Sequence, residues 1–418
     1  MKSFLGINGM RTYIRSNSHK FVHLYLGIIF MMLVCSLYEN ILSHGESMLS
    51  VIYNSGNDCF MDFFNHISYV RNPKEVYYTN YNACFPPFIY IMYYFFSRIL
   101  PVDATTMFVN EATSAQAMLL FVVYNAILTM LLTAGISLLL KEYKEEEKLL
   151  FTFSIVLSST FVLFCVERGN SALIVAILLV WAFVFRERKS GVSHEVALIL
   201  IAMASAIKIY PALFGLLYLK KKSGKEAVRL IIYGMLCFFV PFVFFGGIDG
   251  MRQLVINQSM LQGSRDIGIN SIYTICGSLG MKQYFIFFEV LFAVGLLFLF
   301  ILLEELWKKV FCIVAMMMFL LLWSEEYVGI YLIIPMALFF NNCIENFSMQ
   351  KVRALYTILF AFMFLPIYFQ VENSLTRLFS NRIGTIIGYG ASYIMLIVFV
   401  IELLVKKRNT VEIEADEN

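Results

Sequence analysis

Residues 283–303 read QYFIFFEVLFAVGLLFLFILL, twenty-one positions with a single charged side chain. A helix needs about 20 apolar residues to cross the hydrocarbon core of a bilayer, and this run is long enough. Comparable runs recur along the 418 residues, of which 60% are hydrophobic and only 15% charged. A soluble chain of this length carries more charge. The sequence therefore predicts an all-α polytopic membrane protein.

The charge and the cysteine content argue against a nucleic-acid-binding protein and against a zinc or redox protein. The formal net charge is only +3, and no basic stripe interleaves with aromatic residues, so nucleic acid is not an expected partner. The eight cysteines form no CxxC pair. This argues against a zinc or redox site, and we expect neither a metal nor a cofactor.

The distribution of apolar segments and basic loops predicts the topology. Basic loops lie on the cytoplasmic side of membrane proteins, and Lys351 with Arg353, Lys308 with Lys309, and the tail from Lys406 follow that rule. Both termini are therefore expected in the cytoplasm. Taken as single crossings, the candidate spans are about 21–42, 86–100, 114–140, 149–166, 169–185, 195–219, 228–246, 283–303, 308–323, 327–341, 354–369 and 386–405.

The segment 195–219 has two interpretations. It crosses once, which gives twelve spans, or it enters and returns, which keeps the basic residues at 186–189 and at 220–225 both inside. We favour the second, with a break at Lys208-Ile209-Tyr210-Pro211, because proline removes a donor and disfavours helix just before it. The short segment 86–100 is then also re-entrant. The expected bundle has about 10 to 12 membrane helices.

No internal repeat and no linker divides the chain. We expect one integral-membrane domain over residues 1–411. Residues 412–418 are acidic and are predicted to form a short disordered tail.

Two carboxylates follow the first apolar run, in the stretch SGNDCFMD at 55–62. Asp58 and Asp62 are spaced i, i+4, so a short helix would place both on one face. One interpretation is an amphipathic helix on the outer surface with solvated carboxylates. The other is a general base held where a lipid-linked substrate presents its head group.

Two cations occur where the chain is otherwise apolar. Arg168 lies in the stretch Glu167-Arg168-Gly169-Asn170 between two hydrophobic segments, and Lys208 lies beside Pro211. The non-functional interpretations are an ordinary helical turn at Arg168 and a Lys208 side chain that reaches toward the membrane surface. Because charge inside a membrane is costly and Arg binds phosphate with two donors, a phosphate contact is the functional one.

Further polar residues are predicted on the same outer side. They are Asn257, Ser259 and Arg265 in the outer segment 248–282, with Glu325 and Glu326 at another outer turn. Each of these residues alone is weak evidence for a binding site, because polar outer loops are common.

Five motifs in order resemble a known family. They are Gly56-Asn57-Asp58, Phe85-Pro86-Pro87, Gly169-Asn170, Ala206-Ile207-Lys208-x-x-Pro211 and Asn257-Gln258-Ser259. The sequence resembles glycosyltransferase family 87 of the GT-C superfamily over about residues 50–270. The family's usual Tyr-Pro-Pro and Gly-Gln-x-Asn are replaced here by Phe-Pro-Pro and Glu-Arg-Gly-Asn.

The resemblance implies a GT-C-type bundle whose first outer loop carries short amphipathic helices. It also implies transfer of a hexose, with mannose as the expected sugar, from a polyprenyl-phosphate sugar to a lipid-linked glycan or cell-envelope glycolipid on the outer face. The family's base is an aspartate in the first outer loop, and Asp58 matches it, with Asp62 in reserve. Transfer with inversion needs one base and no acid, because the leaving phosphate is already ionised, while nearby cations stabilise its charge. The expected substrate-binding residues are Asn57, Arg168, Asn170, Lys208, Tyr210, Asn257, Ser259, Arg265, Glu325 and Glu326.

Three other functions remain possible interpretations. A flippase would use the same intramembrane charges for a translocation path, but would be insensitive to Asp58→Asn. A polysaccharide polymerase needs a basic outer cavity, and residues 43–84 offer only Arg71 and Lys74. A structural membrane scaffold leaves an intramembrane Lys208 unexplained.

Overall fold

The computed structural model describes residues 2–46, 60–80, 82–100, 114–141, 143–156, 159–188, 190–219, 224–264, 272–320, 326–342, 350–367 and 383–416. Within these ranges the chain is helical almost throughout and forms no strand. The helices, with 3-10 segments marked η, are α1 (Lys2–Leu42), α3 (Met61–Tyr69), η1 (Pro73–Glu75), α4 (Val76–Thr79), α5 (Pro87–Ile99), α6 (Ala115–Leu139), α7 (Glu145–Val156), α8 (Thr160–Arg168), α9 (Ala172–Arg186), α10 (Gly191–Ile207), η3 (Tyr210–Tyr218), α11 (Gly224–Phe239), η5 (Val240–Val243), α12 (Gly247–Ser264), α13 (Ile272–Ser278), η6 (Lys282–Tyr284), α14 (Phe285–Leu302), α15 (Leu306–Phe319), η7 (Glu326–Leu332), α16 (Ile333–Asn342), α17 (Gln350–Met363) and α19 (Ile383–Asp416).

Several helices have the length and composition of membrane spans. In the described parts of the chain five qualify, namely His19–Leu42, Ala115–Leu139, Gly224–Val243, Lys282–Leu302 and Ile386–Lys406. The pair α7 and α8, bent by 61°, makes a sixth if it is one broken span. The predicted class, an all-α polytopic membrane protein, is confirmed. The expected total of about 10 to 12 spans stays a prediction.

The remaining apolar helices are short and lie inside the bundle. α15 buries almost every side chain and α9 buries most of them, whereas α14 exposes most of its own. A helix of 14 or 15 residues is only about 22 Å long, less than the roughly 30 Å of hydrocarbon. Apolar residues thus face the protein core in α9 and α15 and face outward in α14, which suits a helix in contact with lipid.

Two sequence predictions meet different outcomes. The break near Lys208 is confirmed, because α10 ends at Ile207 and η3 begins at Tyr210. The disordered tail at residues 412–418 stays a prediction, while α19 continues to Asp416. Extending an existing helix needs no new nucleus, and Glu and Ala are good or fair helix formers, so the helix runs on.

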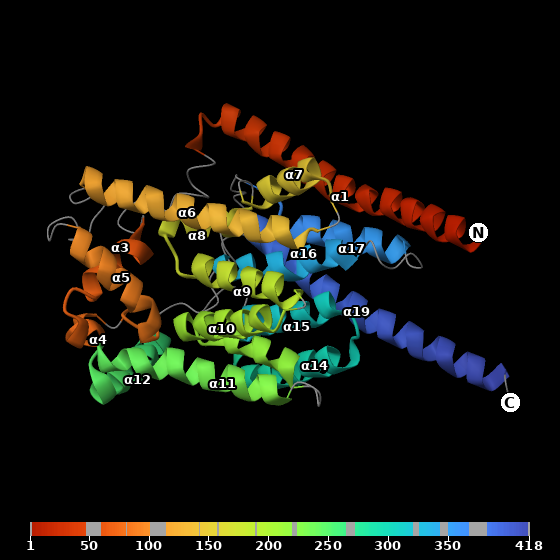
Figure 1. Cartoon of the computed structure of the whole chain (residues 1–418). Coiled ribbons are helices and arrows are strands. Elements are labelled where there is room, and N and C mark those ends of the chain that lie inside the picture. Colours follow the sequence, from red (N-terminus) through yellow and green to blue (C-terminus); the bar gives the residue numbers. More distant parts are fainter. Residues whose placement is uncertain are drawn as a thin grey trace.

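Figure 1 shows how the elements divide between two ends of the molecule. The amino-terminal end of α1 and the carboxy-terminal end of α19 project from the same end, drawn on the right. The short elements α3, α4, α5 and α12 gather at the opposite end. The part of the chain from α3 to α5 therefore lies far from both termini.

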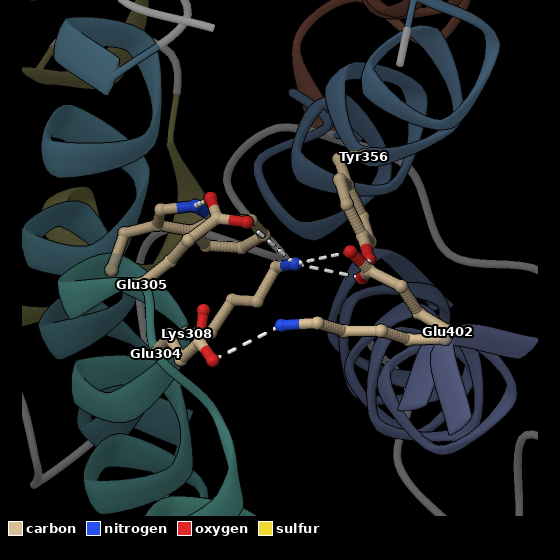
Figure 2. A network of polar contacts seen from close by, with 7 residues as sticks. Glu304, Glu305, Lys308, Tyr356 and Glu402 are labelled. Atoms are coloured by element: carbon tan, nitrogen blue, oxygen red, sulfur yellow. Dashed lines mark hydrogen bonds and ion pairs between the residues drawn. The ribbon is translucent and has the colours of Figure 1, made fainter. Parts of the chain in front are cut away.

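Near the end with the termini, ion pairs join α15 to α19 (Figure 2). The Lys308 ammonium lies 2.9 Å from a Glu305 oxygen and 2.7 Å from a Glu402 oxygen, and Tyr356 of α17 donates to Glu402 at 2.5 Å. Lys406 pairs with Glu304 at 3.0 Å. Lys308, expected in a cytoplasmic loop, is instead only 3% exposed. The two carboxylates explain how its charge is tolerated.

Candidate active site

A partly buried ion pair joins α3 to the end of α8. Asp62 accepts hydrogen bonds from Nε of Arg168 at 3.0 Å and from its Nη2 at 2.9 Å. The side-chain amide of Asn170 donates to the same carboxylate at 2.5 Å. The side chains of Arg168 and Asp62 are 11% and 20% exposed. Residues more than a hundred positions apart in sequence thus form one charge-assisted centre.

A tight turn between α8 and α9 places Arg168 and Asn170. Gly169 ends α8 in the left-handed conformation, with φ of 63°. The Asn170 N–H donates to the Cys165 carbonyl at 2.9 Å, and the Asn170 side-chain oxygen accepts from the Ala172 N–H at 2.8 Å. Glycine is favoured here because it adopts this conformation without strain. It is also required by packing, because a Cβ at Gly169 would lie 2.7 Å from that of Phe63.

Aromatic packing fixes α3 against the bundle. The Phe63 ring lies 4.8 Å from that of Tyr124 and 5.4 Å from that of Phe121. Phe60, with φ of 59°, precedes the helix, and a right-handed helix cannot run through it. The described helix thus begins at Met61 and carries Asp62, and the predicted placement of Asp58 on the same face lies outside the described residues. Most of α3 is buried, so it does not rest on the surface as an amphipathic helix.

The environment of Asp62 favours its ionised form. Burial alone would raise the pKa of this carboxyl group, but the charge and hydrogen bonds of Arg168, the charge of His66 and the Asn170 bond outweigh it and lower the pKa. Asp62 is thus a carboxylate whose oxygens already accept three hydrogen bonds. Such a group orients Arg168 well and is a weak proton acceptor.

Lys208 lies among aromatic rings at the break after α10. Its ammonium is 4.6 Å from the ring centroid of Tyr327, 4.9 Å from that of Phe85 and 6.0 Å from that of Tyr210. Lys208 is 5% exposed. The hydroxyl groups of Tyr210 and Tyr331 are hydrogen-bonded at 3.0 Å, which joins η3 to η7. Ring faces stabilise a desolvated cation here, and the broken helix provides the space.

Stacked rings connect the two cations. Phe164 stacks on Tyr327 with a centroid separation of 6.3 Å and an interplanar angle of 13°. The Arg168 guanidinium lies 5.7 Å from the Phe164 centroid, and the Lys208 ammonium contacts Tyr327. Arg168 and Lys208 therefore belong to one cluster, and the predicted contact of both with a phosphate stays a prediction.

His66 is part of this cluster, although the sequence analysis does not assign it a role. Its ring stacks on Phe85 at 4.4 Å and on Tyr93 at 5.4 Å, and Nδ1 is 3.3 Å from the Tyr90 hydroxyl. Burial lowers the pKa of His66 to about 4; the charge of Asp62 opposes this shift and that of Lys208 adds to it. The spacing of four residues from Asp62 was the available signal, since it places both on neighbouring turns of α3.

Asn257 and Ser259 make contacts of a different kind. The Asn257 amide donates to the main-chain carbonyls of Tyr77 at 2.8 Å and Ala83 at 3.0 Å. Ser259 donates to the Val255 carbonyl of its own helix at 2.9 Å. The expected outer loop around them is the helix α12. Asn257 thus holds the main chain at Tyr77 and Ala83, and its amide donors are already engaged by these carbonyl groups.

Several predicted site residues lie outside the described ranges. These are Asn57, Asp58, Arg265 and Glu325. Glu326 begins η7, directly before Tyr327. In the part of the chain that the structure describes, no group of three or more His, Cys, Asp or Glu side chains is arranged to hold a metal ion.

Comparison with known proteins gives one match. The sequence model of glycosyltransferase family 87 matches residues 84–328, more than half of the 418 residues. No curated protein and no solved structure matches the chain. The matched range includes Arg168, Asn170 and Lys208 and ends next to Tyr327.

Proposed function

The chain belongs to glycosyltransferase family 87, and from this premise we propose that it moves a hexose, mannose first, from a polyprenyl-phosphate sugar to a lipid-linked glycan or cell-envelope glycolipid. The proposed place is the outer face of the cell membrane, with both termini in the cytoplasm. The observation that carries the proposal is the cluster of Arg168 and Lys208 beside α3, at the end of the molecule opposite the termini.

The proposed transfer inverts the anomeric carbon. Asp58 takes the proton from the acceptor hydroxyl, whose oxygen attacks the anomeric carbon. The bond between that carbon and the phosphate oxygen breaks, and polyprenyl phosphate leaves with the electron pair. Arg168 and Lys208 stabilise the charge that grows on the leaving phosphate. No acid is needed, because this phosphate is already a good leaving group.

Asp62 serves a different role in this proposal. Its oxygens are engaged by Arg168 and Asn170, and its pKa is lowered, which disfavours it as the base. It is instead a positioning residue that holds Arg168 in one orientation. Asp58, three residues before the start of α3, remains the proposed base.

The test is a transfer assay with purified protein in liposomes. Radiolabelled polyprenyl-phosphate mannose, glucose and galactose are offered with membrane lipids as acceptors. Asp58→Asn is expected to abolish transfer. Asp62→Asn is expected to lower kcat/KM by about 10- to 100-fold and to keep the pH dependence of the wild type, because the base is unchanged.

Two results would contradict the proposal. If Asp62→Asn abolishes transfer while Asp58→Asn retains it, the roles of the two aspartates are reversed. If the wild type transfers none of the three sugars, the class of donor is wrong.

A further inference from the structure

One face of α12 packs against η1 and α4. Gly250, Leu254 and Asn257 recur at helical spacing in α12, and Gly246 directly precedes the helix with φ of 85°. A Cβ at Gly246 would lie 3.0 Å from the Lys74 carbonyl oxygen, whereas one at Gly250 would lie 2.3 Å from the Phe245 carbonyl oxygen and 3.4 Å from the Tyr77 ring. Leu254 and Asn257 are buried, at 3% and 1% exposed. Gly246 lets the main chain before α12 approach that of Lys74, and Gly250 leaves room for the Phe245 carbonyl at the turn into the helix.

Asn257 is the polar centre of this contact. Its amide nitrogen lies 2.8 Å from the carbonyl oxygen of Tyr77, 3.0 Å from that of Ala83 and 3.5 Å from that of Asn80. Its own oxygen accepts from Gln253 at 3.0 Å, which fixes which way the amide points. Buried carbonyls need donors, so one side chain holds both sides of the 77–84 turn together.

The same segment ends at the cation cluster. The Tyr77 hydroxyl donates to the Phe85 carbonyl at 3.1 Å, and Gln258 donates to the Cys84 carbonyl at 3.2 Å. The next ring, Phe85, stacks on His66 at 4.4 Å and lies 4.9 Å from the Lys208 ammonium. The position of Phe85 therefore depends on how firmly the main chain before it is held.

We propose that Asn257 is a positioning residue for Lys208. By holding the carbonyls of Tyr77 and Ala83, it sets the Phe85 ring against the ammonium and so fixes where that charge lies. This assigns Asn257 to main-chain support in place of the expected contact with sugar hydroxyls. The inference rests on the proposed function, in which Lys208 stabilises the leaving phosphate.

The test combines kinetics with amide hydrogen exchange. Asn257→Ala removes the donor, and Asn257→Asp keeps the shape but replaces the donor with an acceptor. Both are expected to lower kcat at least about tenfold, with the KM for the donor changed less than about twofold, because a misplaced charge chiefly costs transition-state stabilisation. Exchange in peptides covering 77–85 is expected to accelerate. Arg252→Ala, at an exposed position of the same helix, is the control and should change neither.

A double-mutant cycle tests the route through Phe85. Phe85→Leu removes the ring under Lys208 and keeps an apolar side chain. If Asn257 acts through this ring, adding Asn257→Ala to Phe85→Leu lowers kcat less than about twofold further. Full additivity of the two losses would contradict the route.

The outcomes separate this inference from the proposed function. Wild-type transfer together with unchanged kcat in both Asn257 variants overturns the positioning role and leaves the proposed function standing. Absence of transfer by the wild type overturns the proposed function. In that case the exchange data still decide whether Asn257 holds the segment, and unchanged exchange refutes it.

Discussion

At the scale of single residues, the site depends on which ionisable groups are paired. Asp62 is held ionised by Arg168 and Asn170, whereas His66, one turn later on α3, is buried among rings and has its pKa lowered to about 4. A carboxylate and a neutral imidazole thus lie side by side. Their different charge states follow from their different partners, because the guanidinium compensates the burial of Asp62.

His66 is expected to make stability depend on pH. An unfolded histidine has a pKa of about 6.5. Because the folded value is about 4, only the unfolded chain binds the proton between these two pH values. The contribution of neutral His66 to the free energy of unfolding is therefore fully present above pH of about 6.5. It falls as the pH drops toward 4, by up to about 3 kcal/mol. His66→Phe should reduce this fall.

The measurement is the thermal unfolding midpoint in detergent between pH 7 and pH 4.5. His44→Asn, at an exposed histidine with φ of 53° that Asn tolerates, is the matched control and should retain the wild-type slope. Equal slopes for His66→Phe and the wild type would show that His66 does not titrate as its burial requires.

At the scale of elements, the turn between α8 and α9 determines the geometry of the ion pair. Any other residue at position 169 would be strained, because the backbone there has φ of 63° and Phe63 lies close by. Gly169→Ala is expected to lower the free energy of unfolding by about 1–3 kcal/mol and to displace α3. Because Asp62 lies on α3, transfer should fall together with the unfolding midpoint.

Gly295 offers a matched control for this substitution. It lies within α14, and a Cβ there would meet nothing within 4 Å. Gly295→Ala is expected to be neutral or to stabilise by up to about 1 kcal/mol, since Ala is the better helix former. If both variants behave alike, the left-handed turn is not what holds α3 in place.

At the scale of the whole molecule, the site and the termini lie at opposite ends (Figure 1). Lys308 of α15 pairs with Glu402 of α19 close to the carboxy terminus, so these parts of the two helices lie at the same end; the side of the membrane that they face stays a prediction. The proposed orientation therefore places α12 outside and the end of α19 inside.

Cysteine labelling in intact cells tests this orientation. Arg252 of α12 and Lys406 of α19 have side chains that are 74% and 65% exposed. In a background without native cysteines, Arg252→Cys should react with a membrane-impermeant maleimide, and Lys406→Cys should react only after permeabilisation. The reverse pattern would place the site in the cytoplasm.

The sequence by itself determined the class of the protein, the break after Ile207 and the glycine turn at Gly169. These features depend on local chemistry, namely long apolar runs, a proline that removes a donor and a residue that tolerates positive φ. Family membership also followed from local motifs, because each motif is short and contiguous.

Only the tertiary structure decided which polar groups meet. Arg168 of α8 pairs with Asp62 of α3, and His66 is buried beside Lys208. Asn257 donates to the main-chain carbonyl of Tyr77. The sequence could not assign these partners, because a buried charge accepts any well-placed opposite charge and the helix packing determines which one arrives. For the same reason Lys308, predicted to lie in a loop, is buried between Glu305 and Glu402.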